Sequence, residues 1–171
     1  MKLYCGTYAK YNNGSLYGKW LDLDDYADND EFEAACRELH KDEQDPELMF
    51  QDCDCEYDWE KSLYSESGDY EDYYEVKDAL DRSNIDGEVF DAWINATSNK
   101  ATAEAVKECE EQYCGKYDDP ADYAEEIITE CYDMRAIPET IKYHIDWSGI
   151  WRDMSFEGYY YENGYIFDTN R

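Results

Sequence analysis

The chain has 171 residues, with 44 Asp and Glu against 15 Lys and Arg, and a formal net charge of -29. This sign disfavours binding to nucleic acid or to an anionic membrane, and no segment predicts a membrane span. The mean hydropathy of -0.95 is typical of disordered chains, but 17% aromatic residues and only 3 prolines favour a packed core. We therefore expect a folded protein with an acidic surface and a cationic partner.

The cysteines indicate the redox environment. There are 7 of them, an odd number, and the first ten residues lack the apolar core of a signal peptide. Reduced thiols and a cytoplasmic location are the simplest interpretation.

The N-terminal part predicts a small ββαβ unit. Lys2–Tyr8 and Ser15–Leu23 alternate large and small or polar residues as strands do, and Asn12–Gly14 supplies turn residues between them. A helix is expected from Asp28 to His40, because Asp28 or the next residue can cap it and apolar residues recur at helical spacing. Glu47–Asp52 is expected as a third strand. We assign residues 1–62 to this first domain.

The middle of the chain predicts helices and no strands. The expected helices are 69–81, 87–96 with a cap at Asn84 or Asp86, and 102–112 with a cap at Thr102. These helices define a second domain, 63–111.

The C-terminal part predicts a second α+β unit, 112–171. A strand is expected in 112–119, and a helix in 119–132 with Pro120 in its first turn. The stretch 137–154 is expected to be helical and can break at Ser148-Gly149. Asn163-Gly164 predicts a tight hairpin within 158–169. The fold class is therefore α+β, with two α+β end units flanking a helical middle.

Metal sites are not supported by the spacing of potential ligands. Asp22–Glu33 resembles a calcium-binding loop, but Ala27 stands where the loop needs glycine and Tyr26 stands at a ligand position. Cys53 and Cys55, with the remaining cysteines and the two histidines, do not supply a paired four-ligand zinc set. We expect no metal and no cofactor.

Catalytic motifs are likewise missing from the sequence. It contains no nucleophile elbow and no glycine-rich phosphate loop. His40 and His144 fall in helical stretches and are interpreted as surface or interface residues rather than catalytic bases. We expect a protein that is not an enzyme and has no catalytic residue.

The spacing of the acidic residues suggests a function. Side chains three or four residues apart on a helix lie about 5–6 Å from each other, and phosphates along a DNA strand have a comparable separation. Such a surface can imitate a polyanion. The candidate residues are Asp69, Glu71, Asp72, Glu75, Asp78, Asp81, Glu104, Glu108, Glu111, Asp118, Asp119, Asp122, Glu125, Glu126 and Glu130.

The order of several motifs resembles a known family. "YCGTYAKYNNGSLYGKWLDL", "DPELMFQD", "YSES", "KYDDPADYAEE", "IPETIKYHIDWSGIWRDM" and a terminal "GYIF" hairpin are similar to the ArdA antirestriction proteins. The resemblance runs through nearly the whole chain. It implies an elongated, dimeric DNA mimic of three small domains, encoded on a mobile genetic element.

The resemblance also implies the partner. ArdA proteins inhibit Type I restriction–modification enzymes, and the expected contact is the DNA-binding groove of the methyltransferase core. One alternative is an acidic mimic of DNA directed at a nucleoid protein or a CRISPR effector. Another is a metal-dependent enzyme or calcium buffer.

The resemblance implies a homodimer joined through the C-terminal region. Tyr113 and Tyr117 are possible dimer contacts, because amphipathic aromatic rings suit interfaces. The stretch Ile137–Trp151 carries only Glu139 and Asp146 as acids, so it would repel a second copy little.

Overall fold

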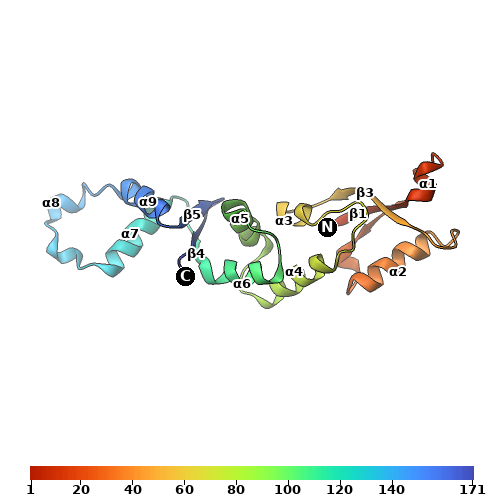
Figure 1. Cartoon of the computed structure of the whole chain (residues 1–171). Coiled ribbons are helices and arrows are strands. Elements are labelled where there is room, and N and C mark those ends of the chain that lie inside the picture. Colours follow the sequence, from red (N-terminus) through yellow and green to blue (C-terminus); the bar gives the residue numbers. More distant parts are fainter. The chain divides into compact units, whose positions relative to one another are not determined.

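The structure is a computed structural model that describes residues 1–171. Residue contacts divide the chain into two units. Figure 1 labels the helices and strands of both units. The N-terminal unit contains Met1–Asp91 and Asn99–Lys107, and the C-terminal unit contains Ala92–Ser98 and Glu108–Arg171. Each unit has one three-stranded sheet with helices, which confirms the α+β class.

The sheet of the N-terminal unit is antiparallel. It consists of β1 (Lys2–Thr7), β2 (Lys19–Asp22) and β3 (Leu48–Asp54) in the order β2-β1-β3. Leu3 and Cys5 point to the same face of β1 and are fully buried. Three strands and the helix after β2 form the predicted ββαβ unit.

The connection from β1 to β2 differs from the simple turn that the sequence predicted. Residues Tyr8–Asn12 form a helix, α1, capped by Thr7, whose Oγ1 accepts a hydrogen bond from the Lys10 amide at 3.3 Å. Gly14, with φ of 79°, then reverses the chain. The second strand is consequently shorter than predicted.

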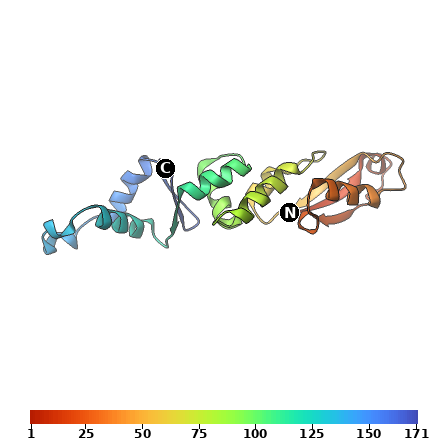
Figure 2. The same cartoon turned by 90° about the horizontal axis from the view of Figure 1, so that it is seen from below.

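Helix α2 (Asn29–Leu39) covers one face of this sheet (Figures 1 and 2). Asp28 caps it as predicted, since its Oδ1 accepts a hydrogen bond from the Glu31 amide at 2.9 Å. Phe32 and Cys36 project from the helix into the core and are fully buried.

Two further helices complete the same core. They are α3 (Asp58–Ser62), which the sequence analysis missed, and α4 (Glu71–Arg82). Tyr70, just before α4, packs edge-on against Phe50 of β3 at a ring distance of 5.2 Å. Trp59 of α3 stacks on Tyr73 of α4 at 5.9 Å. The core therefore continues across residues 62 and 63, where the predicted first and second domains meet.

Helices α5 (Gly87–Thr97) and α6 (Ala103–Gln112) contribute residues to both units. Thr102 caps α6 as predicted, because its Oγ1 accepts a hydrogen bond from the Ala105 amide at 3.1 Å. The expected helices of the middle are confirmed. The division into three domains stays a prediction.

The sheet of the C-terminal unit has the order β4-β6-β5, with β4 (Tyr113–Lys116), β5 (Tyr159–Glu162) and β6 (Tyr165–Asp168). The central strand β6 is buried throughout. Asn163 and Gly164 join β5 to β6 with φ of 53° and 89°, so the predicted two-residue hairpin is confirmed.

Helix α7 (Pro120–Cys131) begins at Asp119, which accepts a hydrogen bond from the Ala121 amide at 2.8 Å. The chain continues through a short 3-10 helix (Met134–Ala136), α8 (Glu139–Lys142) and α9 (Trp147–Phe156). None of the helices is both long and apolar enough for a membrane crossing.

The break predicted at Ser148-Gly149 is wrong, because the helix is interrupted at residues 143–146 instead. Asp146 caps α9, and its Oδ1 accepts a hydrogen bond from the Gly149 amide at 2.9 Å. Gly149 therefore lies in the first turn of α9.

Candidate polyanionic surface

All fifteen predicted acids are exposed. Twelve of them lie on three helices that keep the predicted spacing of three or four residues. The acids are Glu71, Asp72, Glu75, Asp78 and Asp81 on α4, Glu104, Glu108 and Glu111 on α6, and Asp122, Glu125, Glu126 and Glu130 on α7.

The other three acids precede helices. Asp69 lies two residues before α4, where its Oδ1 accepts a hydrogen bond from the Glu71 amide at 3.4 Å. Asp119 is the cap of α7, and Asp118 precedes it. Asp69 and Asp119 therefore also stabilise helix starts, and the helical spacing predicted for Asp69 does not hold.

Two of the acids on helices have a basic neighbour. Asp78 forms an ion pair with Arg82, and Glu104 forms one with Lys107 at 3.0 Å. The partners of each pair are three or four residues apart on one helix, so both ion pairs could have been predicted from the sequence spacing. Asp78 and Glu104 consequently contribute less negative potential than their neighbours.

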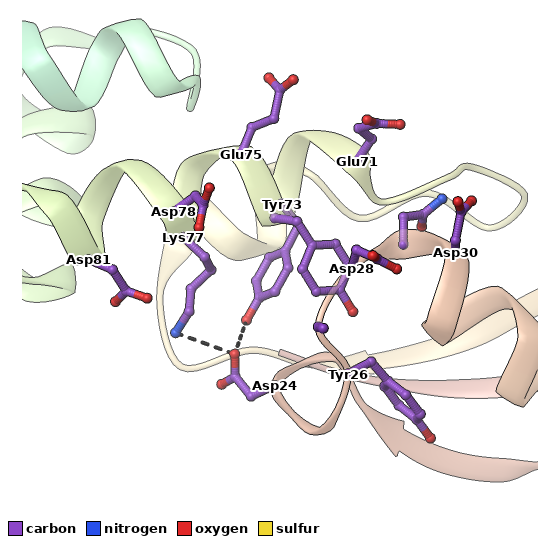
Figure 3. Close-up of a pocket in the computed structure, with 13 residues that line it drawn as sticks. Asp24, Tyr26, Asp28, Asp30, Glu71, Tyr73, Glu75, Lys77, Asp78 and Asp81 are labelled. Carbon is purple, nitrogen blue, oxygen red and sulfur yellow. Dashed lines mark hydrogen bonds and ion pairs between the residues drawn. The ribbon is translucent and has the colours of Figure 1, made fainter.

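An acidic groove lies between α4 and the segment from Asp24 to Asp30, with a volume of about 480 Å³ (Figure 3). Acidic residues of both the segment and the helix line this groove. Seven carboxylates and one lysine line it: Asp24, Asp28, Asp30, Glu71, Glu75, Asp78, Asp81 and Lys77.

Sequence reasoning missed the contribution of the 24–30 segment to this groove. In the sequence this stretch resembles a calcium-binding loop and, from Asp28 onward, predicts the start of a helix. Two carboxylates in this part of the chain bond the backbone: Asp22, just before the segment, accepts a hydrogen bond from the Asp24 amide at 3.3 Å, and Asp28 within it caps α2. No periodic pattern links the segment to α4, so only the tertiary packing brings the two acidic groups together.

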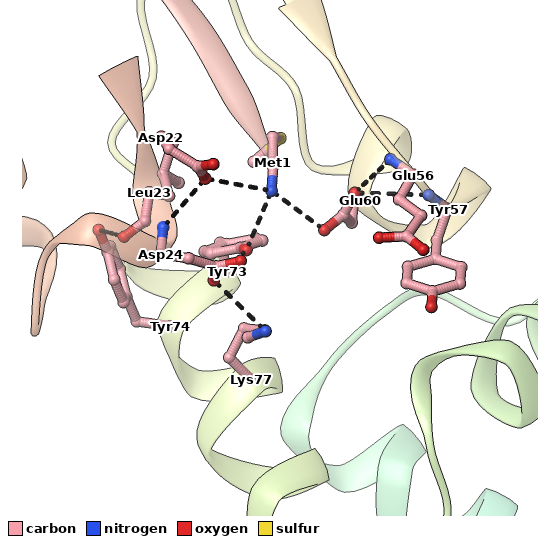
Figure 4. A network of polar contacts seen from close by, with 10 residues as sticks. All are labelled: Met1, Asp22, Leu23, Asp24, Glu56, Tyr57, Glu60, Tyr73, Tyr74 and Lys77. Carbon is pink, nitrogen blue, oxygen red and sulfur yellow. Dashed lines mark hydrogen bonds and ion pairs between the residues drawn. The ribbon is translucent and has the colours of Figure 1, made fainter.

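Tyr73 joins the two walls of the groove (Figures 3 and 4). Its hydroxyl donates a hydrogen bond to Asp24 at 3.0 Å and accepts one from the α-amino group of Met1 at 3.2 Å. The amino group also lies 3.3 Å from Glu60. Burial raises the pKa of Tyr73, so its hydroxyl stays a neutral donor.

Asp24 has two polar partners on α4, Tyr73 and Lys77. Partial burial by itself raises its pKa, but the Tyr73 hydroxyl and the Lys77 ammonium, 3.3 Å away, bring the pKa below its ordinary value of 3.8. The ionised form of Asp24 is therefore preferred in the folded protein.

Replacing Asp24→Asn should change how stability depends on pH. Because its pKa is lowered on folding, Asp24 stabilises the fold above the unfolded pKa, and this contribution disappears as pH falls through the lower, folded value. The side chain is half exposed, so the effect should stay below about 1 kcal/mol. Urea unfolding at pH 7, 4 and 2 measures it.

The variant Asp25→Asn is the control, because it removes a neighbouring exposed acid. The free-energy difference between wild type and Asp24→Asn should shrink toward pH 2, whereas the difference for Asp25→Asn should change less. A pH-independent difference for Asp24→Asn would contradict the assigned interactions.

A second polar cluster lies around His40. Ligand atoms of His40, Asp42 and Glu43 all lie within 4.8 Å of one another. The Lys10 ammonium lies among them, 3.0 Å from His40 Nδ1 and 2.8 Å from Asp42 Oδ1. Desolvation opposes the charge of Lys10, but its hydrogen bonds to the two carboxylates raise its pKa. The Lys10 ammonium thus occupies the position among these three side chains that a bound metal ion would take.

His40 is fully buried, so its interpretation as a surface or interface residue is wrong. Its Nε2 lies 3.3 Å from the Cys5 carbonyl oxygen and donates to it, which leaves Nδ1 to accept from Lys10. The neighbouring β1 backbone and Lys10 satisfy both ring nitrogens. His144 is exposed.

The two predicted dimer contacts are half-buried within the C-terminal unit. The Tyr113 ring packs 5.9 Å from Phe167, and the Tyr117 ring packs 5.2 Å from Tyr123. The Tyr117 hydroxyl donates to Glu126 at 3.0 Å. Most of the surface of both rings is therefore covered by contacts within the C-terminal unit.

Comparison with known proteins agrees with the motifs. A family model described as "Antirestriction protein (ArdA)" matches residues 3–167. A search of curated proteins found no match. The family match spans both units, including every predicted acidic residue. The chain therefore belongs to the ArdA family of antirestriction proteins.

Proposed function

We propose that this protein imitates DNA and inhibits Type I restriction–modification enzymes by occupying the DNA-binding groove of their methyltransferase core. It acts by binding, without catalysis and without a cofactor. The observation that carries the proposal is that all fifteen predicted acids are exposed, twelve of them on helices at a spacing of three or four residues.

The physical basis is electrostatic complementarity. An enzyme groove that binds duplex DNA is lined with cations, and a rigid array of carboxylates can pair with them. The tyrosines support this array without adding positive charge, as Tyr73 does at Asp24. Because the net charge is -29, encounter with a cationic groove should be fast and should slow as salt rises.

Competition with labelled duplex DNA for a purified Type I methyltransferase tests the proposal. The protein should displace the DNA, with an affinity that falls as salt rises, and its expression should raise phage plating in a Type I restricting host. Simultaneous binding of DNA and protein to the enzyme would contradict mimicry. Parallel assays with a nucleoid protein and a CRISPR effector test the alternative target.

We further propose that the protein is a homodimer joined through the C-terminal unit. Tyr132, Ile141, Tyr143 and Phe156 of this unit are exposed apolar side chains, with Tyr143 and Phe156 at 83% and 82% exposure. Large exposed apolar side chains are typical of interfaces. They are more available to a second copy than Tyr113 and Tyr117.

The double variant Tyr143→Ser with Phe156→Ser should convert the dimer to a monomer, because it removes two large apolar contacts from each copy. Light scattering at micromolar concentration measures the mass. The pair Tyr113→Ala with Tyr117→Ala is the comparison and should affect the mass less. A wild-type protein of monomeric mass would refute the dimer itself.

A further inference from the structure

The N-terminal sheet has a free edge at β2. The order β2-β1-β3 leaves β2 and β3 as edge strands. The outer edge of β3 is covered at Phe50, whose amide donates to the Glu66 carbonyl at 2.8 Å and whose carbonyl accepts from the Tyr64 hydroxyl at 2.7 Å. The outer edge of β2 has no such cover from a neighbouring segment.

The register of β2 shows which backbone groups face outward. The Leu23 amide donates to the Met1 carbonyl at 3.0 Å, so this pair is hydrogen-bonded. Hydrogen-bonded pairs alternate along an antiparallel ladder, so Leu21 and Lys19 also bond β1. The N–H and C=O groups of Trp20 and Asp22 consequently point away from β1, toward the free edge.

Large apolar side chains flank this edge. Trp20 is 43% exposed and packs edge-on against Tyr4 at 5.5 Å, and Leu16, whose carbonyl accepts from the Tyr4 hydroxyl, is 69% exposed. Gly18 lies so close to β1 that an added Cβ would be 2.5 Å from the Cys5 carbonyl oxygen. The close approach of the chain at this point is therefore possible only with glycine.

The charge of this region differs from the rest of the protein. Residues 1–21 contain three lysines and not one of the 44 acids. A cationic groove has no electrostatic reason to bind there. β2 is short and Lys19 is a residue type that protects edges, but exposed Trp20 and Leu16 have the opposite effect. An aromatic and aliphatic surface of this kind is typical of protein contacts.

We propose that the free edge of β2 pairs with an extended segment of the target enzyme, which adds a fourth strand to the sheet. The segment carries apolar side chains at alternating positions, to contact Trp20 and Leu16, and it has no net positive charge. The inference rests on the proposed function, because that function supplies the enzyme. The acidic groove begins at Asp24, two residues after β2, so the two contacts are continuous along the chain.

Two substitutions at one position separate the ring from the backbone. Trp20→Ser removes the indole and should speed dissociation from the methyltransferase about 10-fold, as expected for an interface aromatic residue. Trp20→Pro also removes the outward N–H, which bonds nothing inside the sheet, and should add roughly a further 3- to 10-fold. Tyr160→Ser, at a 39% exposed tyrosine of edge strand β5, is the control and should dissociate like wild type.

Hydrogen exchange of the wild-type protein gives an independent readout. The amides of Trp20 and Asp22 should exchange rapidly in the free protein and slowly in the complex with the methyltransferase. This measurement decides the question even if Trp20→Pro does not fold.

Each outcome has a distinct meaning. Equal dissociation rates for Trp20→Ser and Trp20→Pro would refute strand addition, and so would unchanged exchange at 20 and 22 in a complex that excludes DNA. Loss of the dimer in either variant would assign the edge to a second copy and overturn the proposal. A wild-type protein that fails to bind the enzyme would refute the proposed function together with this inference.

Discussion

Neutralising four acids of α4 together should weaken inhibition of the target enzyme by about 30-fold. The variant combines Glu71→Gln, Asp72→Asn, Glu75→Gln and Asp81→Asn. An exposed charge pair contributes about 0–1 kcal/mol, so four lost pairs amount to roughly 2 kcal/mol. Asp78 is left unchanged, because Arg82 already partly neutralises it. Titration of enzyme activity at several salt concentrations measures the loss, and the dependence on salt should also decrease.

A matched variant separates the surface from the total charge. It neutralises four exposed acids of the same unit that lie outside the predicted surface: Glu47, Asp54, Asp58 and Glu66. This control should weaken inhibition by less than about 3-fold, and so should the single change Glu75→Gln. An equal loss in both fourfold variants would show that only total charge matters. Abolition by Glu75→Gln in a folded protein would refute the distributed surface.

The fourfold variant should remain folded. Glu71 and Asp72 lie in the first turn of α4, where each carboxylate stabilises the helix by roughly 0.3–1 kcal/mol. Relief of repulsion in a protein of charge -29 opposes this loss. The melting temperature should therefore move by only a few degrees, so that a binding defect can be interpreted as such.

Replacing Phe50→Ala should destabilise the whole N-terminal unit by about 3–5 kcal/mol. Phe50 is 2% exposed and contacts both Phe32 of α2 and Tyr70 beside α4, so its loss leaves a cavity between the sheet and two helices. For a unit of this size the melting temperature should fall by more than about 12 °C. Thermal unfolding followed by circular dichroism measures the fall.

The same variant tests whether α4 and the sheet unfold together. Hydrogen exchange should lose protection in α4 and in β1 to a similar extent, because one core holds both. Leu16→Ala is the control, since this side chain is 69% exposed and its removal should cost little. Selective loss of protection in the sheet, with α4 unaffected, would support separate first and second domains at residues 62 and 63.

Local patterns in the sequence predicted most of the secondary structure. Helix caps were predictable because a cap bonds only backbone amides a few residues away. The examples are Asp28 before α2, Thr102 before α6, and Asp119 with Pro120 at the start of α7. Asn163-Gly164 predicted its hairpin for the same reason, since both residues tolerate positive φ. The exposure of the predicted acids also followed from sequence, because unpaired charges are costly to bury.

Local patterns were less informative where distant partners decide the outcome. α3 is only five residues long, and Trp59 within it is buried by stacking on Tyr73 of α4. His40 was expected at a surface, yet Lys10 and the Cys5 carbonyl satisfy its ring in the interior. Gly149 suggested a helix break, but its amide donates a hydrogen bond to the Asp146 side chain, which caps α9.

The sequence by itself thus determined the α+β class of the protein, most of its longer helices, the C-terminal hairpin and the exposure of the predicted acids. Only the tertiary structure decided which acids line the groove beside α4. The groove depends on Tyr73, whose buried ring packs against Trp59 while its hydroxyl reaches Asp24, forty-nine residues away in the chain. The spacing of residues in the sequence does not predict this hydrogen bond, because the bond depends on how α4 packs against the sheet. The free edge of β2 is likewise a property of strand order, which depends on long-range pairing rather than on local residues.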